Sequence, residues 1–331
     1  MESSGRRGFL NALSASAGAL AAGAASLPAF AQAYPSHPVR LYVPIAPGGL
    51  TDTLARAIGA GLAERIGQPV VVENRPGGGG VIGMQAAARA APDGYGLAFV
   101  YQGVASVNPV LLKNPPYDTI RDFVAVALVA QFPLILLVSP ETKARTVAEL
   151  VELARTAPGG LNYGSAGNAT TSHLAMELFK RQAKVDMVHV PYKGESPAMT
   201  GLVGGSITVL FATPTVALPM IKSGRVRALA ISTAQRSALL PDLPTVAEGG
   251  LADFAVGGWY GILAPTGTPA TIVDRLAAEL AIVLKDSDLR ARLAAQGVEP
   301  MWAGPADADA WLRADTRKWQ QVIVESGISV D

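Results

Sequence analysis

Residues 39–67 read VRLYVPIAPGGLTDTLARAIGAGLAERIG: a short apolar run, a turn with two glycines, and a longer segment of helical periodicity. The apolar run at 39–43 predicts a buried strand, and residues 52–66 predict a helix that ends at Gly67. A strand that turns directly into a helix is the building unit of α/β proteins. This stretch therefore indicates the fold class.

Strand-like and helix-like segments alternate along the rest of the chain. We expect further strands at residues 70–72, 97–100, 124–129, 134–138, 161–163, 186–190, 208–211 and 228–231. We expect further helices after the glycines at 77–80, at 147–155, from about 171, at 198–203, at 270–284, from 289, and at 307–325. This regular spacing predicts mostly parallel sheets flanked by helices.

Two segments are candidates for crossings between lobes: residues 129–133 and Gly257–Gly258. Two crossings predict one lobe from residues 34–130 plus 257–331 and a second lobe from residues 131–256, with a cleft between them. Ligands of open α/β sheets bind beyond the carboxyl ends of the strands. The loops that follow the strands are therefore the candidate site.

The first 33 residues have the plan of a bacterial export signal. Arg6-Arg7 precedes an Ala/Gly/Ser-rich run, and small-x-small cleavage sites end at Ala31 and Ala33. A retained anchor is the alternative, but a span needs about 20 predominantly apolar residues, and glycine, serine and Asn11 dilute this run. We expect removal of residues 1–33, after export by the twin-arginine or the general secretory route, and a periplasmic protein.

Composition argues against several function classes. The 27 basic and 26 acidic residues nearly cancel, so no nucleic-acid or membrane-surface partner is indicated. The absence of cysteine excludes disulfides, thiolate zinc sites and cysteine nucleophiles. The three histidines, His37, His173 and His189, lack the i, i+4 spacing of a metal site, so we expect no metal and no cofactor.

Two loops are candidate binding segments, and neither contains Lys or Arg. In residues 45–51, two glycines let backbone N–H groups approach a ligand, and the following helix N-terminus favours an anion. Residues 163–173, YGSAGNATTSH, can surround a carboxylate with neutral donors. The alternatives are a tight turn capped by Thr51 or Asp52 and a solvated loop with a Ser/Thr cap. We expect His173 to be structural.

Signatures of catalysis and of nucleotide binding are weak. Residues 77–83 satisfy G-x-G-x-x-G, but no acidic residue follows the next predicted strand at 97–100, as a dinucleotide site requires. Residues 194–198 only approximate the G-x-S-x-G elbow. No acid, base and nucleophile come together, which favours a binding protein over a hydrolase that uses Ser165 or Ser196.

Seven motifs occur in order over the chain that follows the export signal. They are YPSHPVR at 34–40, PGGLTD at 47–52, VVENRPG at 71–77, APDGY at 91–95, YGS at 163–165, HVPYKG at 189–194 and LPDLPT at 240–245. In combination they resemble the Bug family of periplasmic solute-binding receptors, the extracytoplasmic component of tripartite tricarboxylate transporters. The resemblance implies a two-lobed type II periplasmic-binding-protein fold, a carboxylate-bearing ligand and no catalysis. It also implies delivery by a monomer to the large and small permease subunits of the transporter.

The resemblance also implies site residues. In that family the two loops hold a ligand carboxylate through backbone amides, small hydroxyls and bound water. Carried over, the residues are Ile45, Ala46, Gly48, Gly49 and Asp52 on one lobe, and Ser165, Ala166, Thr170 and Thr171 on the other.

One position departs from the family pattern. After the strand that ends at Phe211, many relatives carry an aspartate suited to hold a ligand ammonium, whereas this chain has Ala212, followed by Thr213-Pro214. The candidate ligand-binding position Ala212 thus disfavours an amino acid. It favours a mono-, di- or tricarboxylate or an aromatic acid. Presentation of the ligand to a sensor kinase is the alternative function.

Overall fold

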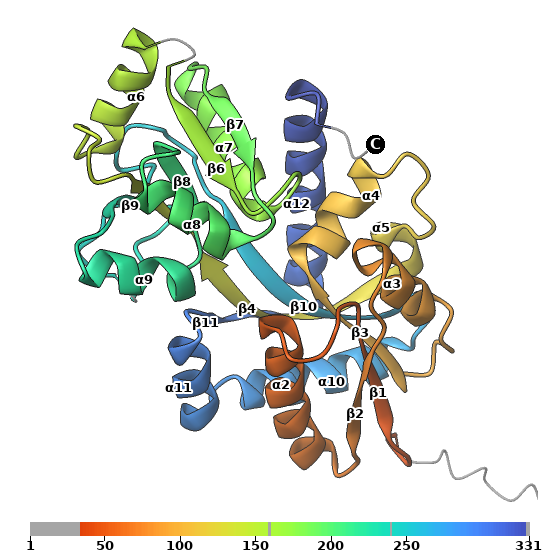
Figure 1. Cartoon of the computed structure of the whole chain (residues 1–331). Coiled ribbons are helices and arrows are strands. Elements are labelled where there is room, and N and C mark those ends of the chain that lie inside the picture. Colours follow the sequence, from red (N-terminus) through yellow and green to blue (C-terminus); the bar gives the residue numbers. More distant parts are fainter. Residues whose placement is uncertain (1–33, 158–159, 239, 329–331) are drawn as a thin grey trace, which may run out of the picture. The chain divides into compact units, whose positions relative to one another are not determined.

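The quoted segment forms β1 (Val39–Val43) and α2 (Leu50–Ile66), and β1 lies inside a 6-stranded sheet (Figure 1). The strand order across this first sheet is β11-β4-β10-β3-β1-β2. Its other strands are β2 (Val70–Asn74), β3 (Gly96–Tyr101), β4 (Phe123–Pro133), β10 (Gly257–Pro265) and β11 (Glu299–Ala303). The computed structural model describes residues 34–157, 160–238 and 240–328, and His37–Asp331 form one compact unit. The predicted export signal at 1–33 lies outside the described residues.

A second sheet has five strands in the order β7-β6-β8-β5-β9. They are β5 (Ile135–Val138), β6 (Asn162–Ser165), β7 (Val188–Pro191), β8 (Val209–Ala212) and β9 (Arg227–Ile231). The helices with the first sheet are α3 (Val81–Ala88), α4 (Asn108–Leu111), α5 (Thr119–Asp122), α10 (Ala270–Val283), α11 (Ser287–Ala295) and α12 (Pro305–Glu325), with the short helices η1 (Gly78–Gly80) and η2 (Gly103–Val107). Those with the second are α6 (Val147–Thr156), α7 (Thr171–Ala183), α8 (Glu195–Val203) and α9 (Pro214–Lys222).

Strand directions confirm the mostly parallel α/β fold class. In the first sheet β1, β2, β3 and β4 run the same way, and β10 and β11 run the opposite way. In the second sheet β6, β7, β8 and β9 run the same way, and β5 opposes them. Two of the opposed strands, β5 and β10, begin where the chain has just passed from one sheet to the other.

The two chain crossings are tied together by one buried hydroxyl. Leu134 alone separates β4 from β5, and its backbone N–H donates to Ser232 Oγ at 2.8 Å. The same hydroxyl donates to the carbonyl of Val256, just before β10, at 2.5 Å. Ser232 therefore links both crossings. The lobe boundaries at 130 and 256 stay a prediction.

Apolar side chains on both faces of β1 explain why it is almost wholly buried. Leu41 lies toward α2, and Tyr42 packs with Met84 of α3. The C-terminal helix α12 joins both cores: Leu312 packs with the first sheet, whereas Trp319 packs with the apolar core of the second.

The sequence patterns missed two strands. β10 begins with the Gly257–Gly258 pair that suggested only a crossing, and β11 is a short strand at the sheet edge. Helix α2 begins at Leu50, two residues earlier than expected. None of the helices in the described part of the chain is both long and apolar enough to span a membrane.

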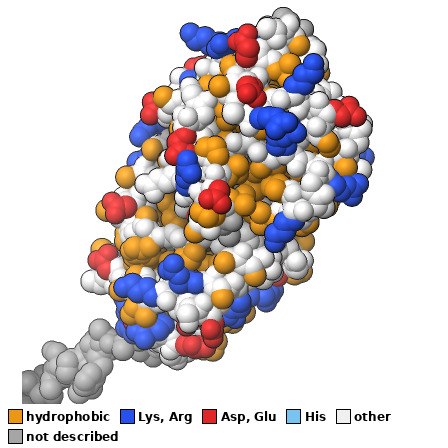
Figure 2. Space-filling view, turned by 90° about the vertical axis from the view of Figure 1, so that its left-hand side faces the viewer, with side chains coloured by type: hydrophobic (Ala, Val, Ile, Leu, Met, Phe, Trp, Pro, Cys, Tyr) orange, Lys and Arg blue, Asp and Glu red, His pale blue; other side chains and the backbone are white. Residues whose placement is uncertain are grey.

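Charges of both signs are interspersed on the face in Figure 2, and hydrophobic side chains gather near its middle. This distribution agrees with the near-neutral balance of the whole sequence.

Candidate functional site

Both candidate loops lead into helices whose N-termini lack a side-chain cap. The N-cap residues are Gly49 for α2 and Thr170 for α7, and neither helix has a side-chain cap hydrogen bond. Thr51 and Asp52 lie inside α2, so the alternative interpretation, a turn capped by one of these residues, is wrong. The first backbone N–H groups of an α-helix have no partner within the helix. Both N-termini can therefore donate to an anion.

Asp52 organises the first loop. Its side chain is 4% exposed and accepts from Gly48 N–H at 2.9 Å, from Asn74 Nδ2 at 2.9 Å and from Arg56 Nε at 3.1 Å. Burial by itself would raise the pKa of Asp52, but these hydrogen bonds outweigh burial and hold it below its ordinary value. The carboxylate is thus engaged by the protein and positions the loop.

The backbone of the first loop is held at one end and open at the other. Asn74 Nδ2 also donates to the carbonyl of Ile45 at 3.2 Å. Ala46, Gly48 and Gly49 are exposed. Gly48 has φ +93°, a left-handed conformation that favours glycine, whereas Gly49 has φ −83°. The exposed backbone of this loop can approach a ligand closely.

In the second loop, the small side chains bond mainly to the loop itself. Ser165 is fully buried, and its Oγ lies 2.6 Å from His189 Nε2 and 3.1 Å from Gly167 O. Ala166 N–H donates to Ser172 Oγ at 3.0 Å. The Thr170 hydroxyl donates to Gly167 O at 2.7 Å. These contacts shape the loop, so ligand contacts fall to the free N–H groups of α7.

A stack of aromatic rings holds the second loop through a hydrogen bond to its backbone. His173 and His189 have ring centroids 4.0 Å apart, and Tyr163 stacks on His189 at 4.8 Å. His173 Nδ1 accepts from Ala169 N–H at 3.0 Å, and Ala169 has φ +58°. Burial lowers the pKa of His173 to about 4 and also lowers the pKa of His189. His173 Nδ1 can accept from Ala169 N–H only when the imidazole is neutral. His173 therefore has the structural role that the sequence predicts.

Ser165 and His189 have the spacing of a nucleophile and its base. Ser165 is wholly buried, and the ring of His189 stacks on those of His173 and Tyr163. Within residues 34–157, 160–238 and 240–328, no carboxylate hydrogen-bonds to His189. The third member of a triad is therefore missing from this part of the chain.

Gln102 connects α7, which follows the second loop, to the edge of the first sheet where the first loop lies, and sequence reasoning missed it. It follows β3, which is parallel and adjacent to β1, so the loops after both strands share an edge. Gln102 is 2% exposed; its Oε1 accepts from Thr171 Oγ1 at 3.5 Å, and its Nε2 donates to Gly257 O at 3.0 Å. The only indication of Gln102 in the sequence is that a polar residue follows an apolar strand.

Ala212, the candidate position outside the two loops, ends β8 and lies buried in an apolar cluster. The next residue, Thr213, donates from its N–H and from its hydroxyl to the two carboxylate oxygens of Glu195, each at 2.6 Å. An acid thus lies beside the position where the sequence lacks one. Glu195 was not among the predicted site residues, because it follows a different strand.

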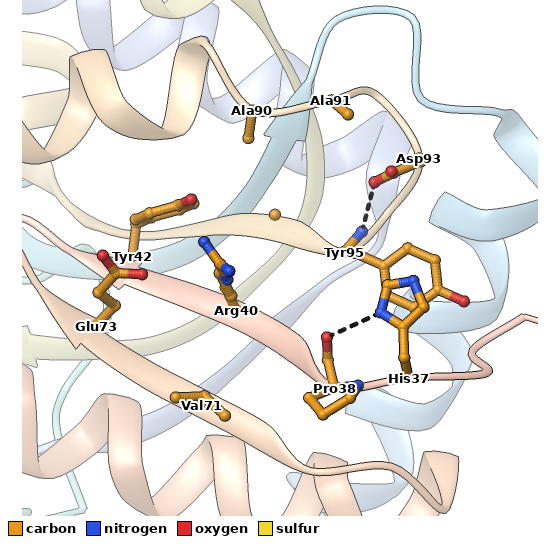
Figure 3. A pocket seen from close by; sticks show the side chains of 11 residues that line it. His37, Pro38, Arg40, Tyr42, Val71, Glu73, Ala90, Ala91, Asp93 and Tyr95 are labelled. Atoms are coloured by element: carbon orange, nitrogen blue, oxygen red, sulfur yellow. Dashed lines mark hydrogen bonds between the residues drawn. The ribbon is translucent and has the colours of Figure 1, made fainter.

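A separate cavity of about 650 Å³ lies at the amino ends of β1 and β3 (Figure 3). His37 stacks on Tyr95 with ring centroids 3.6 Å apart, and Arg40 and Glu73 line the same cavity. The candidate loops follow the carboxyl ends of their strands, so this cavity is not the predicted site.

The sequence is similar to those of known proteins. Residues 54–328 match the family described as "Tripartite tricarboxylate transporter family receptor". "Protein BugT" of Bordetella pertussis is 34% identical over 301 residues, which cover 91% of this chain and 92% of that protein.

Two solved structures resemble the fold closely. R. palustris Rpa4515 with adipate is 34% identical, with a TM-score of 0.73, over 89% of this chain and 99% of that chain. The periplasmic binding protein BugD is 34% identical, with a TM-score of 0.69, over 89% of this chain and 99% of that chain.

Proposed function

Because the chain belongs to the tripartite tricarboxylate transporter receptor family, we propose that it captures a small carboxylate-bearing solute in the periplasm and delivers it to a transporter of that type. Receptors of this family bind solutes rather than catalyse reactions. Delivery would be to the large and small permease subunits, by a monomeric receptor. The adipate in the related R. palustris structure supports a carboxylate as the ligand.

The observation that carries this proposal is the pair of uncapped helix N-termini at adjoining sheet edges. Each N-terminus carries about half a positive charge, and the Thr171–Gln102 contact brings α7 to the edge where α2 begins. The loops contain no Lys or Arg. Oriented N–H groups would therefore neutralise the anion, with water completing its hydrogen bonds.

Roles for the candidate residues follow from their contacts. We assign direct ligand contacts to the backbone of Ile45, Ala46 and Gly49 and to the backbone N–H and hydroxyl of Thr171. We assign positioning roles to Gly48, Asp52, Ser165, Ala166 and Thr170, whose polar groups bond within the loops. The buried methyl group of Ala212 leaves contacts at that position to its neighbours. The lobes would be residues 34–130 plus 257–331 and residues 131–256, closing over the ligand.

A thermal-shift screen of carboxylic acids tests the ligand class. A ligand at 100 times its Kd stabilises the native state by about 2.7 kcal/mol, which shifts the melting temperature measurably. We expect at least one small carboxylic acid to do so. A panel of mono-, di- and tricarboxylates and aromatic acids without any shift would contradict the proposal.

Calorimetry with the acid that emerges tests the location. Thr171→Ala removes a hydroxyl at the proposed site, and the loss should be about 0.5–1.5 kcal/mol for a neutral hydrogen bond and up to about 3 for a charged one. Thr156→Ala is the matched control, because its hydroxyl bonds only to its own helix α6. Equal affinities in both variants would place the site elsewhere.

Uptake tests the partner. Cells that lack this receptor should lose accumulation of the radiolabelled acid, and the full-length receptor should restore it. Restoration that does not require the permease subunits would contradict delivery to the transporter.

A further inference from the structure

Glu195 joins two loops at the carboxyl edge of the second sheet. It is the first residue of α8, and its two carboxylate oxygens accept from Thr213 N–H and Thr213 Oγ1, each at 2.6 Å. Residue 195 follows β7, and residue 213 follows β8. The carboxylate therefore bridges the ends of two strands that are not neighbours.

That bridge joins the two strands on either side of β6, the strand that leads into the proposed binding loop. In the sheet order, β6 lies between β7 and β8, and it is parallel to both. Gly194 N–H donates to the carbonyl of Ala166 at 3.0 Å, which places the residue before Glu195 against the start of the loop after β6. Glu195 thus belongs to the same edge as Thr170 and Thr171.

The charge of Glu195 is offset only in part, by its place in the first turn of α8 and by the hydrogen bond from Thr213 N–H. Other largely buried carboxylates have cation partners: Asp52 pairs with Arg56, Glu177 with Lys180, and Asp315 with Lys318. Glu195 is only partly exposed, and no Lys or Arg in the described ranges forms an ion pair with it. Burial raises its pKa, although the hydrogen bonds from Thr213 lower it. An unpaired, largely desolvated carboxylate is costly.

If Glu195 only held the loop at Thr213 in place, burying a charged group would not be necessary. A neutral acceptor, such as a glutamine amide oxygen, could accept from Thr213 N–H without a charge. An ionised carboxylate has about four lone-pair positions, and Thr213 occupies two. The remaining positions can accept from a donor on a bound molecule.

We propose that Glu195 selects the solute: its carboxylate accepts a hydrogen bond from an ammonium or hydroxyl group at the end of the ligand opposite the bound carboxylate, and it disfavours a second carboxylate there. This inference rests on the proposed function. It replaces the expectation from Ala212, because the acid absent after β8 is supplied from α8. Charge-assisted hydrogen bonds are about twice as strong as neutral ones, and like charges side by side cost several kcal/mol.

A matched series of four- and five-carbon acids tests the selection by calorimetry. The distal group is an amine in 4-aminobutyrate, a hydroxyl in 4-hydroxybutyrate and a carboxylate in succinate, with the five-carbon homologues alongside. We expect the wild-type receptor to bind an amine or hydroxyl member at least about tenfold more tightly than the matched dicarboxylate. Comparison of the amine with the hydroxyl compound identifies which group donates to Glu195. If the screen yields a different acid scaffold, the same three distal groups are compared on it.

Variants separate the effect of the negative charge of Glu195 from the effect of its hydrogen bonds to Thr213. Glu195→Gln keeps an acceptor for Thr213 and removes the charge, and it should reduce the preference to about threefold or less or invert it. Glu152→Gln, which removes an exposed charge from α6, should leave the ratio unchanged. Melting curves confirm that each variant is folded.

The outcomes distinguish the two proposals. A wild-type preference for the dicarboxylate, or a ratio unchanged in Glu195→Gln, overturns the role of Glu195 and leaves the receptor function intact. If no carboxylic acid binds at all, the proposed function fails, and this inference fails with it.

Discussion

At the scale of single residues, Asp52 shows how a loop without basic side chains is held in shape. Asp52→Ala would leave Gly48 N–H without its acceptor and Asn74 Nδ2 with only the carbonyl of Ile45. We expect a loss of about 1–3 kcal/mol in the free energy of unfolding, together with weaker ligand binding, measured by urea denaturation and calorimetry. Asp52→Asn should be milder. Wild-type stability in the alanine variant would show that the loop is held by other contacts.

The pH dependence of this contribution follows from the sign of the shift. The folded-state pKa of Asp52 lies below the ordinary value of 3.8. The unfolded state therefore binds the proton more readily, and the contribution is complete above about pH 4. It is lost as the pH falls further, through the folded-state pKa. The difference in unfolding free energy between wild type and Asp52→Asn should shrink only in that acidic window.

Gly48 and Gly49 form a matched pair with different expectations. Gly48 has φ +93°, so Gly48→Ala should lower the free energy of unfolding by about 1–2 kcal/mol. Gly49 has φ −83°, and an added Cβ would meet only Ile45 Cδ1 at 3.7 Å, an ordinary contact. Alanine is a poorer N-cap residue than glycine, but it also lowers the entropy of the unfolded chain, and these two effects oppose each other. Gly49→Ala should therefore change the free energy of unfolding by only a few tenths of a kcal/mol. Equal denaturation midpoints for both variants would contradict the backbone argument.

At the scale of elements, the sequence predicted the helices and strands that are determined by local residue patterns. β1, α2 and the helices around residues 147–155 and 270–284 follow from apolar periodicity and helix-end signals. β10 was missed because a glycine pair at its start resembles a turn. Side-chain partnerships were also missed. Asn74 is 22 residues from Asp52, and His189 is 24 from Ser165, so each contact exists only because strand pairing brings the residues together.

The histidine stack predicts how the second loop responds to acid. The folded-state pKa of His173 is about 4, against an ordinary value of 6.5. Its neutral form is therefore favoured by folding, and the contribution to stability is complete above about pH 6.5 and declines as the pH falls toward 4. The groups that face this ring are His189 and Tyr163 from the strands and Glu177 and Lys180 from α7.

Unfolding free energies measured between pH 4 and pH 7.5 check this expectation. His173→Phe keeps an aromatic ring but cannot accept from Ala169 N–H or titrate, so it should lower stability at pH 7.5 and flatten the slope below pH 6.5. A variant with the wild-type slope would show that another group, such as His189, carries the pH dependence.

At the scale of the whole molecule, the two crossings decide how the sheets can move. Both pass by Ser232, whose hydroxyl accepts from Leu134 N–H and donates to Val256 O. If the proposed lobes close over a ligand, these crossings are the segments that change their backbone angles. The shared hydroxyl links the two crossings, so we expect them to turn together.

Ser232→Ala should therefore affect both stability and closure. Two buried backbone groups lose their partner, and we expect a loss of about 2–4 kcal/mol in unfolding free energy. Small-angle scattering of the wild type should show a smaller radius of gyration with saturating ligand. The variant should close less completely or bind more weakly, because its crossings are no longer coupled.

Ser223→Ala is the control for this experiment, since that hydroxyl bonds only within α9 and its end. It should match the wild type in stability, ligand affinity and change of radius. If Ser232→Ala is destabilised but closes and binds like the control, the hydroxyl only supports the fold, and the coupling of the crossings is carried by the backbone bonds between Leu134, Ser232 and Val256. Identical scattering of the wild type with and without ligand would instead mean that the crossings do not act as hinges.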